Sequence, residues 1–331
     1  MALISALSLV GLSGMAMPSY AKDTQNYSAH PEAQAFIEKM VGQGFERNML
    51  EQLMADAKRQ QSILDAISRP AEKRLNWGQY RKIFLDKQRI EGGAAFWKKH
   101  HATLAAAEKK YGVPPEIIVA IIGVETRYGR IMGSYRVLDA LATLGFDYPK
   151  RSKFFAGQLE HYLHMTKSEG IDPRSLKGSY AGAMGFGQFI PSSFRSYAVD
   201  FDNDGKRDIW KNEVDAIGSV ANYFAEHGWK KGQPVLSNLT FLKEPQESWF
   251  GEGLKPKRTL NEWKELGVSA ANRTDLSRKA ILLRLEKDDA KRFVFGLDNF
   301  YTITRYNHSR LYAMAVYELS QAVKRRYAES S

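Results

Sequence analysis

The sequence predicts a mainly α-helical protein of the α+β type, with a small antiparallel β subdomain. Over most of its length, apolar residues recur at the three- and four-residue spacings of helices. Residues 115–124 are almost entirely apolar, which is typical of a helix buried on all sides. Between about 233 and 297, Pro, Gly and Lys increase and short alternating runs appear. The 331 residues, 44% of them hydrophobic, can bury a large core divided into two or three subdomains.

Residues 1–21 have the pattern of a secretory signal peptide. They carry no charge, are largely apolar and end in Ser19-Tyr20-Ala21, which fits a small-x-small cleavage site. The Lys or Arg usual near the start of such a segment is absent. No other apolar run approaches the ~20 residues that a membrane-spanning helix needs. We therefore expect an exported, soluble protein without a transmembrane segment.

Cysteine usage and net charge limit the classes of function. The absence of cysteine excludes disulfides, thiolate nucleophiles, Cys-ligated zinc and a lipid attached to an N-terminal Cys. The formal net charge of +11 at pH 7 favours acidic partners. Nucleic acid is the usual partner of such a charge, but no nucleic-acid-binding motif accompanies it. For an exported protein, an anionic polymer of the cell wall or envelope fits better.

Residues 22–110 are expected to form an N-terminal helical domain. From Pro31 onward the apolar residues follow mixed three- and four-residue spacings, interrupted by Arg69-Pro70 and by a pair of glycines at 92 and 93. Residues 96–111 predict one amphipathic helix that leads into the buried segment. No residue of this region points to catalysis.

The stretch from 112 to 130, GVPPEIIVAIIGVETRYGR, places one carboxylate in a buried helix. Pro114 and Pro115 suit a first helical turn, and Gly129 suits a stop after the last turn. Because a helix that is apolar all round gains nothing from water, Glu125 should lie in or beside the core. Desolvation and the negative end of the helix dipole should both raise the pKa of its carboxyl group.

Glu125 has a functional and a structural interpretation. A carboxyl group that is still protonated near neutral pH is what general-acid cleavage of a glycosidic bond requires. The alternative is a structural glutamate neutralised by Arg127 or Arg130, since structural ion pairs also perturb pKa values. The segment alone leaves both interpretations open.

A glycine-rich run, SYAGAMGFGQF, occupies residues 179–189. Its three glycines would allow a ligand to approach the backbone closely, but a tight packing turn explains them as well and is favoured by the run alone. The spacing is not that of a dinucleotide or phosphate loop. Ser179 and Gln188 add uncharged donors and acceptors of the kind that bind sugar hydroxyls and acetamido groups.

Residues 200–208, DFDNDGKRD, predict the first half of a calcium loop of the EF-hand type. Oxygen ligands stand at loop positions 1, 3 and 5, a glycine at 6 and a backbone carbonyl at 7. Position 12 is Lys211 in place of the usual bidentate Glu, so Glu213 or Asp215 would have to complete the sphere. The alternative is an Asp-rich turn in solvent. Nothing in the pattern suggests that calcium takes part in catalysis.

The remaining segments predict a return to the core. Residues 214–223 are helical in pattern, and residues 280–285 and 292–296 flank a charged turn, which predicts a hairpin. A final helix is expected from about Ser309 to Arg326.

The chain resembles the lytic murein transglycosylase B family throughout its mature length. The resemblance rests on the order and spacing of five segments: VETRYG, SYAGAMGFGQF, the calcium-type loop, VANY and YNHSRLYA. The resemblance implies a goose-lysozyme-like helical core. This core would span 111–232, with the calcium-type loop at 200–215, between the N-terminal domain (22–110) and a β-rich subdomain (233–298), and residues 299–331 would return to it.

The resemblance also implies the roles of individual residues. Glu125 matches the catalytic acid. Positions of the glycan site are matched by Ser179, Gln188, Phe189, Tyr223, Tyr306, Asn307 and Tyr312. The calcium ligands, taken as structural, are matched by Asp200, Asp202, Asp204, the Lys206 carbonyl and Asp215. One extra residue between Trp210 and Asp215 departs from the family pattern, so Glu213 competes with Asp215 as the last ligand.

The activity that the resemblance implies is non-hydrolytic cleavage of the β-1,4 bond between N-acetylmuramic acid and N-acetylglucosamine in peptidoglycan. Glu125 would act first as acid and then as base, giving a 1,6-anhydro product, whereas ordinary glycosidases use two carboxylates. The expected setting is a periplasmic monomer without an organic cofactor, with peptidoglycan glycan strands as its partner and other cell-wall enzymes as candidate partners. The sequence does not distinguish endo from exo action.

Two alternatives remain at the level of sequence. A muramidase of the same fold would release reducing ends and would need a water-activating base, for which Asp139, Asp147 and Glu160 are the candidates. A non-catalytic scaffold would use the basic surface to hold anionic glycan and would leave Glu125 a structural role. The presence of Glu125 together with Ser179 and Gln188 argues against the scaffold.

Overall fold

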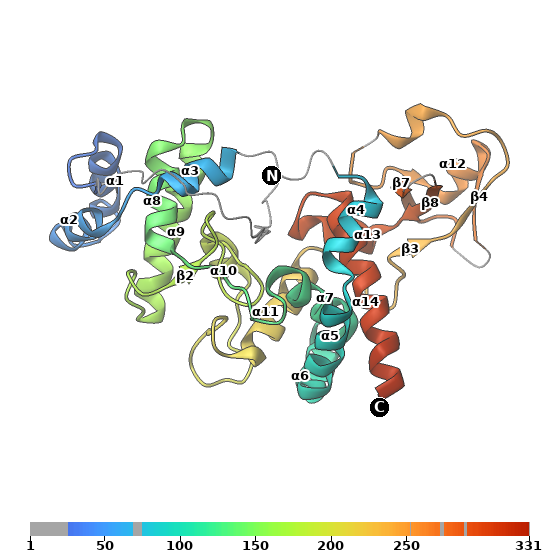
Figure 1. Cartoon of the computed structure of the whole chain (residues 1–331), viewed down its shortest axis with the longest axis horizontal. Helices are drawn as coiled ribbons and strands as arrows, with labels where there is room; N and C mark the ends of the chain where they lie inside the picture. Colours follow the sequence, from blue (N-terminus) through green and yellow to red (C-terminus); the bar gives the residue numbers. More distant parts are fainter. Residues whose placement is uncertain (1–25, 69–74, 252, 272–274, 288–289, 331) are drawn as a thin grey trace, which may run out of the picture.

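The computed structural model describes residues 26–330 apart from 69–74, 252, 272–274 and 288–289. The predicted signal peptide lies outside these residues. The described chain is mainly helical with small antiparallel sheets, which confirms the predicted fold class. In Figure 1 the first helices lie at one end of the long axis and the β subdomain at the other, with the remaining helices between them.

The N-terminal helical segment divides between two hydrophobic cores. Its first three helices pack with α8 and α9 around one cluster of buried side chains, which α10 also joins. This cluster contains residues such as Ile37, Leu53, Leu141 and Tyr162. The helices concerned are α1 (Pro31–Val41), α2 (Arg47–Asp56), α3 (Gln61–Ser68), α8 (Val137–Asp147), α9 (Ser152–Glu169) and α10 (Pro191–Tyr197).

The second core surrounds helix α7, which contacts helices from distant parts of the chain. Its buried members run from Trp77 to Val323 in the C-terminal helix, so this core is complete only when that helix is in place. The helices concerned are α4 (Trp77–Phe84), α5 (Lys87–Lys99), α6 (His101–Tyr111), α7 (Pro115–Thr126), α11 (Glu213–Glu226), α13 (Asp298–Tyr306) and α14 (Arg310–Ser330).

Helix α7 is the buried helix that the sequence predicts. Pro115 is its first residue, and every residue from 115 to 124 is buried. The helix ends at Thr126, before the predicted stop at Gly129. Arg127 and Tyr128 adopt left-handed backbone conformations, with φ of 49° and 62°, ahead of Gly129 at 84°. These conformations are strained for residues with a side chain, so the surrounding contacts must hold them in place.

The prediction of one helix over residues 96–111 is wrong. Helix α5 ends at Lys99 and α6 begins at His101, because His100 has φ −110° and ψ 25°. The break lets the two helices use different partners: α5 packs on α7 and α14, and α6 packs chiefly on α11. The helical spacing of apolar residues continues across His100, so tertiary packing, and not the local sequence pattern, determines where the helix breaks.

The β subdomain contains a four-stranded sheet of order β3-β8-β7-β5 and a separate pair, β4 with β6. Strands β7 and β8 pair antiparallel over seven residue pairs, which confirms the predicted hairpin. Alternate side chains of β7 enter different cores: Ile281 and Leu283 join the α7 core, and Leu282 joins a third cluster with Trp263 and Phe295. The strands are β3 (Leu236–Ser237), β4 (Leu239–Phe241), β5 (Arg258–Thr259), β6 (Val268–Ala270), β7 (Lys279–Lys287) and β8 (Ala290–Gly296); helix α12 (Leu260–Glu265) lies among them.

A short strand pair connects the glycine-rich run to helix α8. Strand β1 (Tyr135–Arg136) pairs antiparallel with β2 (Lys177–Gly178). Short 3-10 helices occupy Pro149–Arg151 and Glu247–Phe250. Within the described ranges, no helix has the length and apolar character needed to cross a membrane.

Burial lowers the pKa of five histidines below the ordinary value: His100, His161, His164, His227 and His308. His227 is the example with the closest ring contact, since its ring stacks on Tyr223 with centroids 3.9 Å apart. An unfolded histidine titrates near pH ~6.5, so below that value the unfolded chain binds protons that the folded chain does not. The folded state therefore loses stability as pH falls below this value, and the loss levels off below the folded pKa.

We predict that His227→Gln reduces this dependence on pH. Urea unfolding of wild type should show a free energy of unfolding that decreases between about pH 7 and pH 5.5, and the decrease should be smaller in the variant. His101→Gln, at an exposed position of α6, is the matched control and should behave as wild type. An equal decrease in wild type and His227→Gln would contradict the prediction.

Candidate active site

Glu125 lies in the last turn of α7 and is half-buried. The Tyr312 hydroxyl, on α14, donates a hydrogen bond to Glu125 Oε1 at 2.5 Å. Tyr312 itself is fully buried. This hydrogen bond positions the carboxylate oxygen, because the buried Tyr312 hydroxyl cannot exchange the contact for water without movement of a helix.

A second phenol lies near the same carboxyl group. Burial and then the negative charge of Glu125 raise the pKa of Tyr306 and of Tyr312 well above the ordinary value. Both hydroxyls therefore stay protonated and act as donors throughout the pH range of ordinary enzymes. The Tyr306 hydroxyl donates to the Gly187 carbonyl at 2.6 Å. Tyr312 of α14 thus contacts Glu125, and Tyr306 of α13 contacts the glycine-rich run.

Thr126, which sequence analysis missed, fixes the end of α7 against the glycine-rich run. Its hydroxyl lies 3.1 Å from the Ile122 carbonyl and 2.9 Å from the Phe186 carbonyl, and it accepts from the Gly129 amide at 3.0 Å. The only sign of this role in the sequence is the position of Thr126 next to Glu125 in VETRYG. That position does not predict a structural role, because a threonine at the end of a helix often has none. The structure shows that it joins two segments that flank Glu125.

The glycine-rich run is a tight packing turn, the interpretation favoured by sequence. Gly182 and Gly185 have φ of 77° and 67°. A Cβ on Gly185 would lie 2.4 Å from the Ile209 carbonyl oxygen, and one on Gly187 would lie 2.8 Å from the Tyr306 hydroxyl. Larger residues would therefore displace the backbone of this run from its neighbours.

The two polar residues predicted from this run hold its shape. The Ser179 hydroxyl accepts hydrogen bonds from the amides of Ala181 and Ala183. Gln188 has a left-handed backbone, with φ 50°, and its Nε2 donates to the carbonyls of Met132 and Gly185. Gln188 therefore connects the run to the segment that follows α7.

The predicted aromatic residues form one cluster beside this turn. Ring centroids of Tyr223 and Tyr306 are 4.7 Å apart, and Phe189 lies 5.8 Å from Tyr223 and 6.1 Å from Tyr306. The Tyr223 hydroxyl donates to the Arg305 carbonyl at 2.7 Å. Asn307, which follows α13, is buried with 3% of its surface exposed. The structure therefore brings together Glu125, Tyr306 and Tyr312, with Phe189, Tyr223 and Gln188 connected to them through Tyr306 and Gly187.

The carboxylates considered as alternatives have other partners. Asp139 accepts from the Lys58 amide and from Arg136, and Asp147 accepts from the Tyr27 hydroxyl. Glu160 pairs with Lys39. All three belong to the packing of α1–α3 against α8 and α9. Arg127, proposed as a structural partner of Glu125, instead contacts Asp86 at 3.2 Å.

Three of the predicted calcium ligands lie together. One carboxylate oxygen from each of Asp200, Asp202 and Asp204 lies within 4.8 Å of the others. Left-handed Asn203 and Gly205, with φ of 62° and 90°, fold the chain around them. Three carboxylates so close repel one another, and a set of oxygen donors suits a hard cation such as calcium. The side chains present therefore fit a calcium ion.

The two candidates for the last ligand have different surroundings. Asp215 is fully buried, and its carboxylate accepts the amides of Phe201 at 2.7 Å and Asp208 at 2.8 Å. Glu213 pairs with Lys99, and His100 Nε2 lies 2.9 Å from it. Asp215 thus already holds both ends of the loop, while Glu213 faces α5 and α6.

Comparisons with known proteins identify the family of this chain. Residues 28–321 match the family described as the transglycosylase SLT domain. The chain is 46% identical over 308 residues to the membrane-bound lytic murein transglycosylase B of Escherichia coli K12, covering 90% of this chain and 84% of that protein.

Two examples from the similar solved structures show the likeness in fold and sequence. One is the catenated lytic transglycosylase SltB1 of Pseudomonas aeruginosa, with TM-score 0.88 and 50% identity over 91% of this chain and 100% of that one. The other is the Escherichia coli lytic transglycosylase Slt35 in complex with calcium, with TM-score 0.83 and 45% identity over 95% of this chain and 100% of that one.

The chain belongs to the transglycosylase SLT family. It is an enzyme of the lytic transglycosylase class, as the sequence predicts. The resemblance to the lytic murein transglycosylase B family and the lysozyme-like fold class are confirmed by the same comparisons.

The contact between Tyr312 and Glu125 generates a prediction. Tyr312→Phe removes a donor to the carboxylate, and a hydrogen bond to a charged group contributes about 1.5–3 kcal/mol. We expect kcat to fall roughly 10- to 100-fold, with a smaller change in KM. The lost bond favours the ionised form of the Glu125 carboxyl group. The alkaline limb of the pH–rate profile should therefore lie at higher pH in the variant than in wild type.

The measurement is a pH–rate profile with soluble glycan fragments. Tyr317→Phe, on the same helix, is the control and should retain the wild-type profile. A Tyr312→Phe variant with unchanged kcat and profile would show that the hydrogen bond has no part in catalysis.

Proposed function

We propose that this protein cleaves the β-1,4 bond between N-acetylmuramic acid and N-acetylglucosamine in peptidoglycan, leaving 1,6-anhydromuramyl ends. The observation that carries the proposal is the half-buried carboxylate of Glu125, held by Tyr312 beside the glycine-rich turn. Membership of the transglycosylase SLT family and similarity to a lytic murein transglycosylase support the substrate.

In this mechanism Glu125 acts twice. Tyr312 donates to Oε1, so the proton of the acid form belongs on Oε2 and is given to the glycosidic oxygen as the bond to C1 breaks. The resulting carboxylate then takes the proton of the muramic C6 hydroxyl, whose oxygen bonds to C1. The glycosidic oxygen gains one proton and the C6 oxygen loses one, so the carboxyl group returns to its starting state and no water is consumed.

The polar and aromatic residues around Glu125 would hold the glycan. We assign Ser179, Gln188 and Asn307 to the amide and hydroxyl groups of the sugars and assign Phe189, Tyr223 and Tyr306 to their ring faces. The hydrogen bonds within the glycine-rich turn, and the one that it accepts from Tyr306, support this assignment, because they fix the shape of the turn before substrate binds.

The surroundings of the other carboxylates disfavour a muramidase. An inverting hydrolase needs a second carboxylate within about 6.5–9.5 Å of the first, with room for water. The three candidates for this role are engaged in the packing of α1–α3 against α8 and α9. A scaffold without catalysis is disfavoured by the family membership of the chain.

We also propose that the loop from 200 to 215 binds a structural calcium ion through Asp200, Asp202, Asp204, the Lys206 carbonyl and Asp215. The clustered carboxylates support the first three ligands. The similar Slt35 enzyme has been solved in complex with calcium, which supports the choice of ion. Calcium would neutralise the repulsion within the loop and fix it to the start of α11; no catalytic step involves it.

The proposed place of action is the periplasm, where peptidoglycan glycan strands would be the partner of a monomeric enzyme. The charge-free leader pattern of residues 1–21 and the net charge of +11 support this placement. Glycan strands that carry acidic groups would be attracted to a cationic protein.

Glu125→Gln tests the reaction and the role of Glu125 together. The amide cannot donate or take the proton, so we expect cleavage of purified peptidoglycan to fall at least about 1,000-fold. Mass spectrometry of released muropeptides should show anhydro ends with wild type and none with the variant.

The matched control is Glu116→Gln, at the start of the same helix, where the carboxylate pairs with Lys324. It should release the same products as wild type. Reducing-end products from wild type would assign the protein to the hydrolases, and equal activity of Glu125→Gln would remove Glu125 from the mechanism.

Calcium binding predicts a change in stability. A ligand that binds only the folded state at 100 times its Kd adds about 2.7 kcal/mol of stability. We expect calcium chloride to raise Tm relative to EDTA, magnesium chloride to raise it less, and Asp202→Asn to abolish most of the rise. Identical melting in calcium and EDTA would refute the site.

A further inference from the structure

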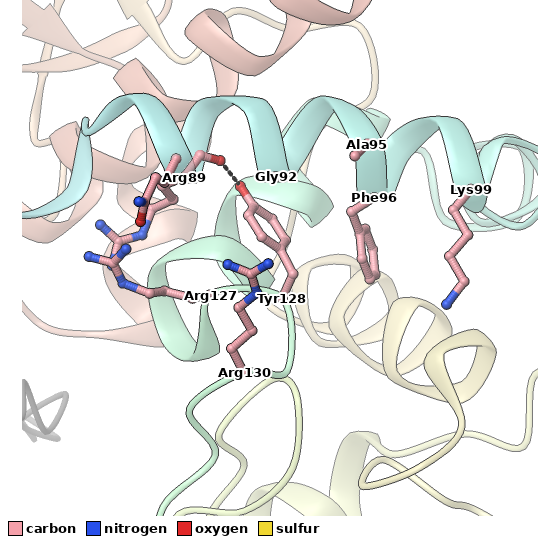
Figure 2. A pocket seen from close by; sticks show the side chains of 9 residues that line it. Arg89, Gly92, Ala95, Phe96, Lys99, Arg127, Tyr128 and Arg130 are labelled. Carbon is pink, nitrogen blue, oxygen red and sulfur yellow. Dashed lines mark hydrogen bonds between the residues drawn. The ribbon is translucent and has the colours of Figure 1, made fainter.

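A pocket of about 230 Å³ lies between helix α5 and the turn that follows α7, away from the residues assigned to the glycan. Figure 2 shows the side chains that line it. Four of them are cationic: Arg89 and Lys99 come from α5, and Arg127 and Arg130 come from the turn. No acidic residue lines the pocket within the described part of the chain.

The charges around the pocket do not balance. Asp86 contacts both Arg89, at 3.0 Å, and Arg127, at 3.2 Å, and Glu213 pairs with Lys99. For Arg130, which is exposed, the described chain shows no ion pair. Two carboxylates therefore serve four cations, which leaves an excess of two positive charges at one pocket.

The cost of this arrangement is visible at Arg89. Only 4% of its surface is exposed, and burial, followed by repulsion from Arg127, lowers its pKa. Its guanidinium also donates to the Gly123 and Ile83 carbonyls, so it cannot turn away from the pocket without losing these bonds. Two guanidinium groups around one carboxylate leave one positive charge unmatched, and a bound anion would offset it.

The wall of the pocket is rigid. The Tyr128 hydroxyl donates to the Arg89 carbonyl at 2.8 Å, the bond drawn in Figure 2. The Tyr128 ring stacks on Phe96, and a Cβ at Gly92 would lie 3.1 Å from it. These contacts hold the left-handed turn at Arg127 and Tyr128, so the cationic groups are presented before any ligand arrives.

This pocket is separate from the glycan site. Gly129 packs against Phe186 of the glycine-rich run, since a Cβ there would lie 2.3 Å from that ring. Arg127, Tyr128 and Arg130 instead line the pocket with α5. The same turn therefore has one face toward the glycan site and another toward the cationic pocket.

We propose that this pocket is a binding site for a small oxyanion, a carboxylate or a phosphate group, held by Arg89, Arg127 and Arg130 with Lys99 at its edge. Planar guanidinium groups bind both kinds of group through paired N–H donors. Since a water molecule occupies about 30 Å³ of liquid, a volume of this size holds a phosphate or a short dicarboxylate. The site is independent of the proposed cleavage reaction and requires no glycan.

The test is calorimetric titration of the full chain with sodium phosphate and, separately, with sodium succinate, at constant ionic strength set by sodium chloride. We expect saturable binding of at least one probe and a Tm that rises with its concentration. Arg130→Gln should weaken that binding roughly tenfold or more, because it removes a charge-assisted hydrogen bond. Arg130 is exposed, so its replacement should leave the fold intact.

Lys264→Gln, which removes one exposed positive charge from α12 in the β subdomain, is the matched control and should bind as wild type. Binding of phosphate alone would assign the site to phosphate-bearing ligands, and binding of succinate would assign it to carboxylate-bearing ones. The proposal is wrong if neither probe binds above chloride, or if Lys264→Gln weakens binding as much as Arg130→Gln.

Discussion

The hydrogen bond from Tyr312 to Glu125 is the interaction on which the rest of the site depends. It joins α7 to α14, and its two residues are 187 positions apart in the chain. The bond can form only when the chain has passed through the β subdomain and returned along α13. Thr126 then ties the same end of α7 to the glycine-rich run through the Phe186 carbonyl. One carboxyl group is thus held by segments from the middle and the end of the sequence.

Electrostatics divides the two faces of the turn after α7. On one face the carboxylate of Glu125 lies beside phenols that remain neutral, which suits the proposed role of Glu125 as acid and then base. On the other face guanidinium groups outnumber their carboxylate partners. Thr126 and Gly129 contact the glycine-rich run on one side, and Arg127 and Tyr128 line the cationic pocket on the other, so the strained turn is the structural element that the two sites share.

The features that could be predicted from sequence are those that local pattern determines. The apolar run of α7, the β7–β8 hairpin and the clustered aspartates all depend on residues close in the chain. The break at His100 could not be predicted, because packing of α6 on α11 decides it. The role of Thr126 and the pairing of Arg127 with Asp86 could not be predicted either, because both are contacts with segments far away in the chain. The assignment of Glu125 and of the glycan residues needed the family resemblance, since one buried carboxylate has a structural explanation as well.

The central claim is that one carboxylate completes the proposed cleavage without water. Digestion of purified peptidoglycan in water enriched in oxygen-18, followed by mass spectrometry of the products, tests it most directly. If Glu125 passes the proton of the C6 hydroxyl and that oxygen attacks C1, no heavy oxygen enters the muramic ends formed by cleavage. Incorporation of one heavy oxygen at each new muramic end would show that water is the nucleophile, and a second carboxylate would then have to be found.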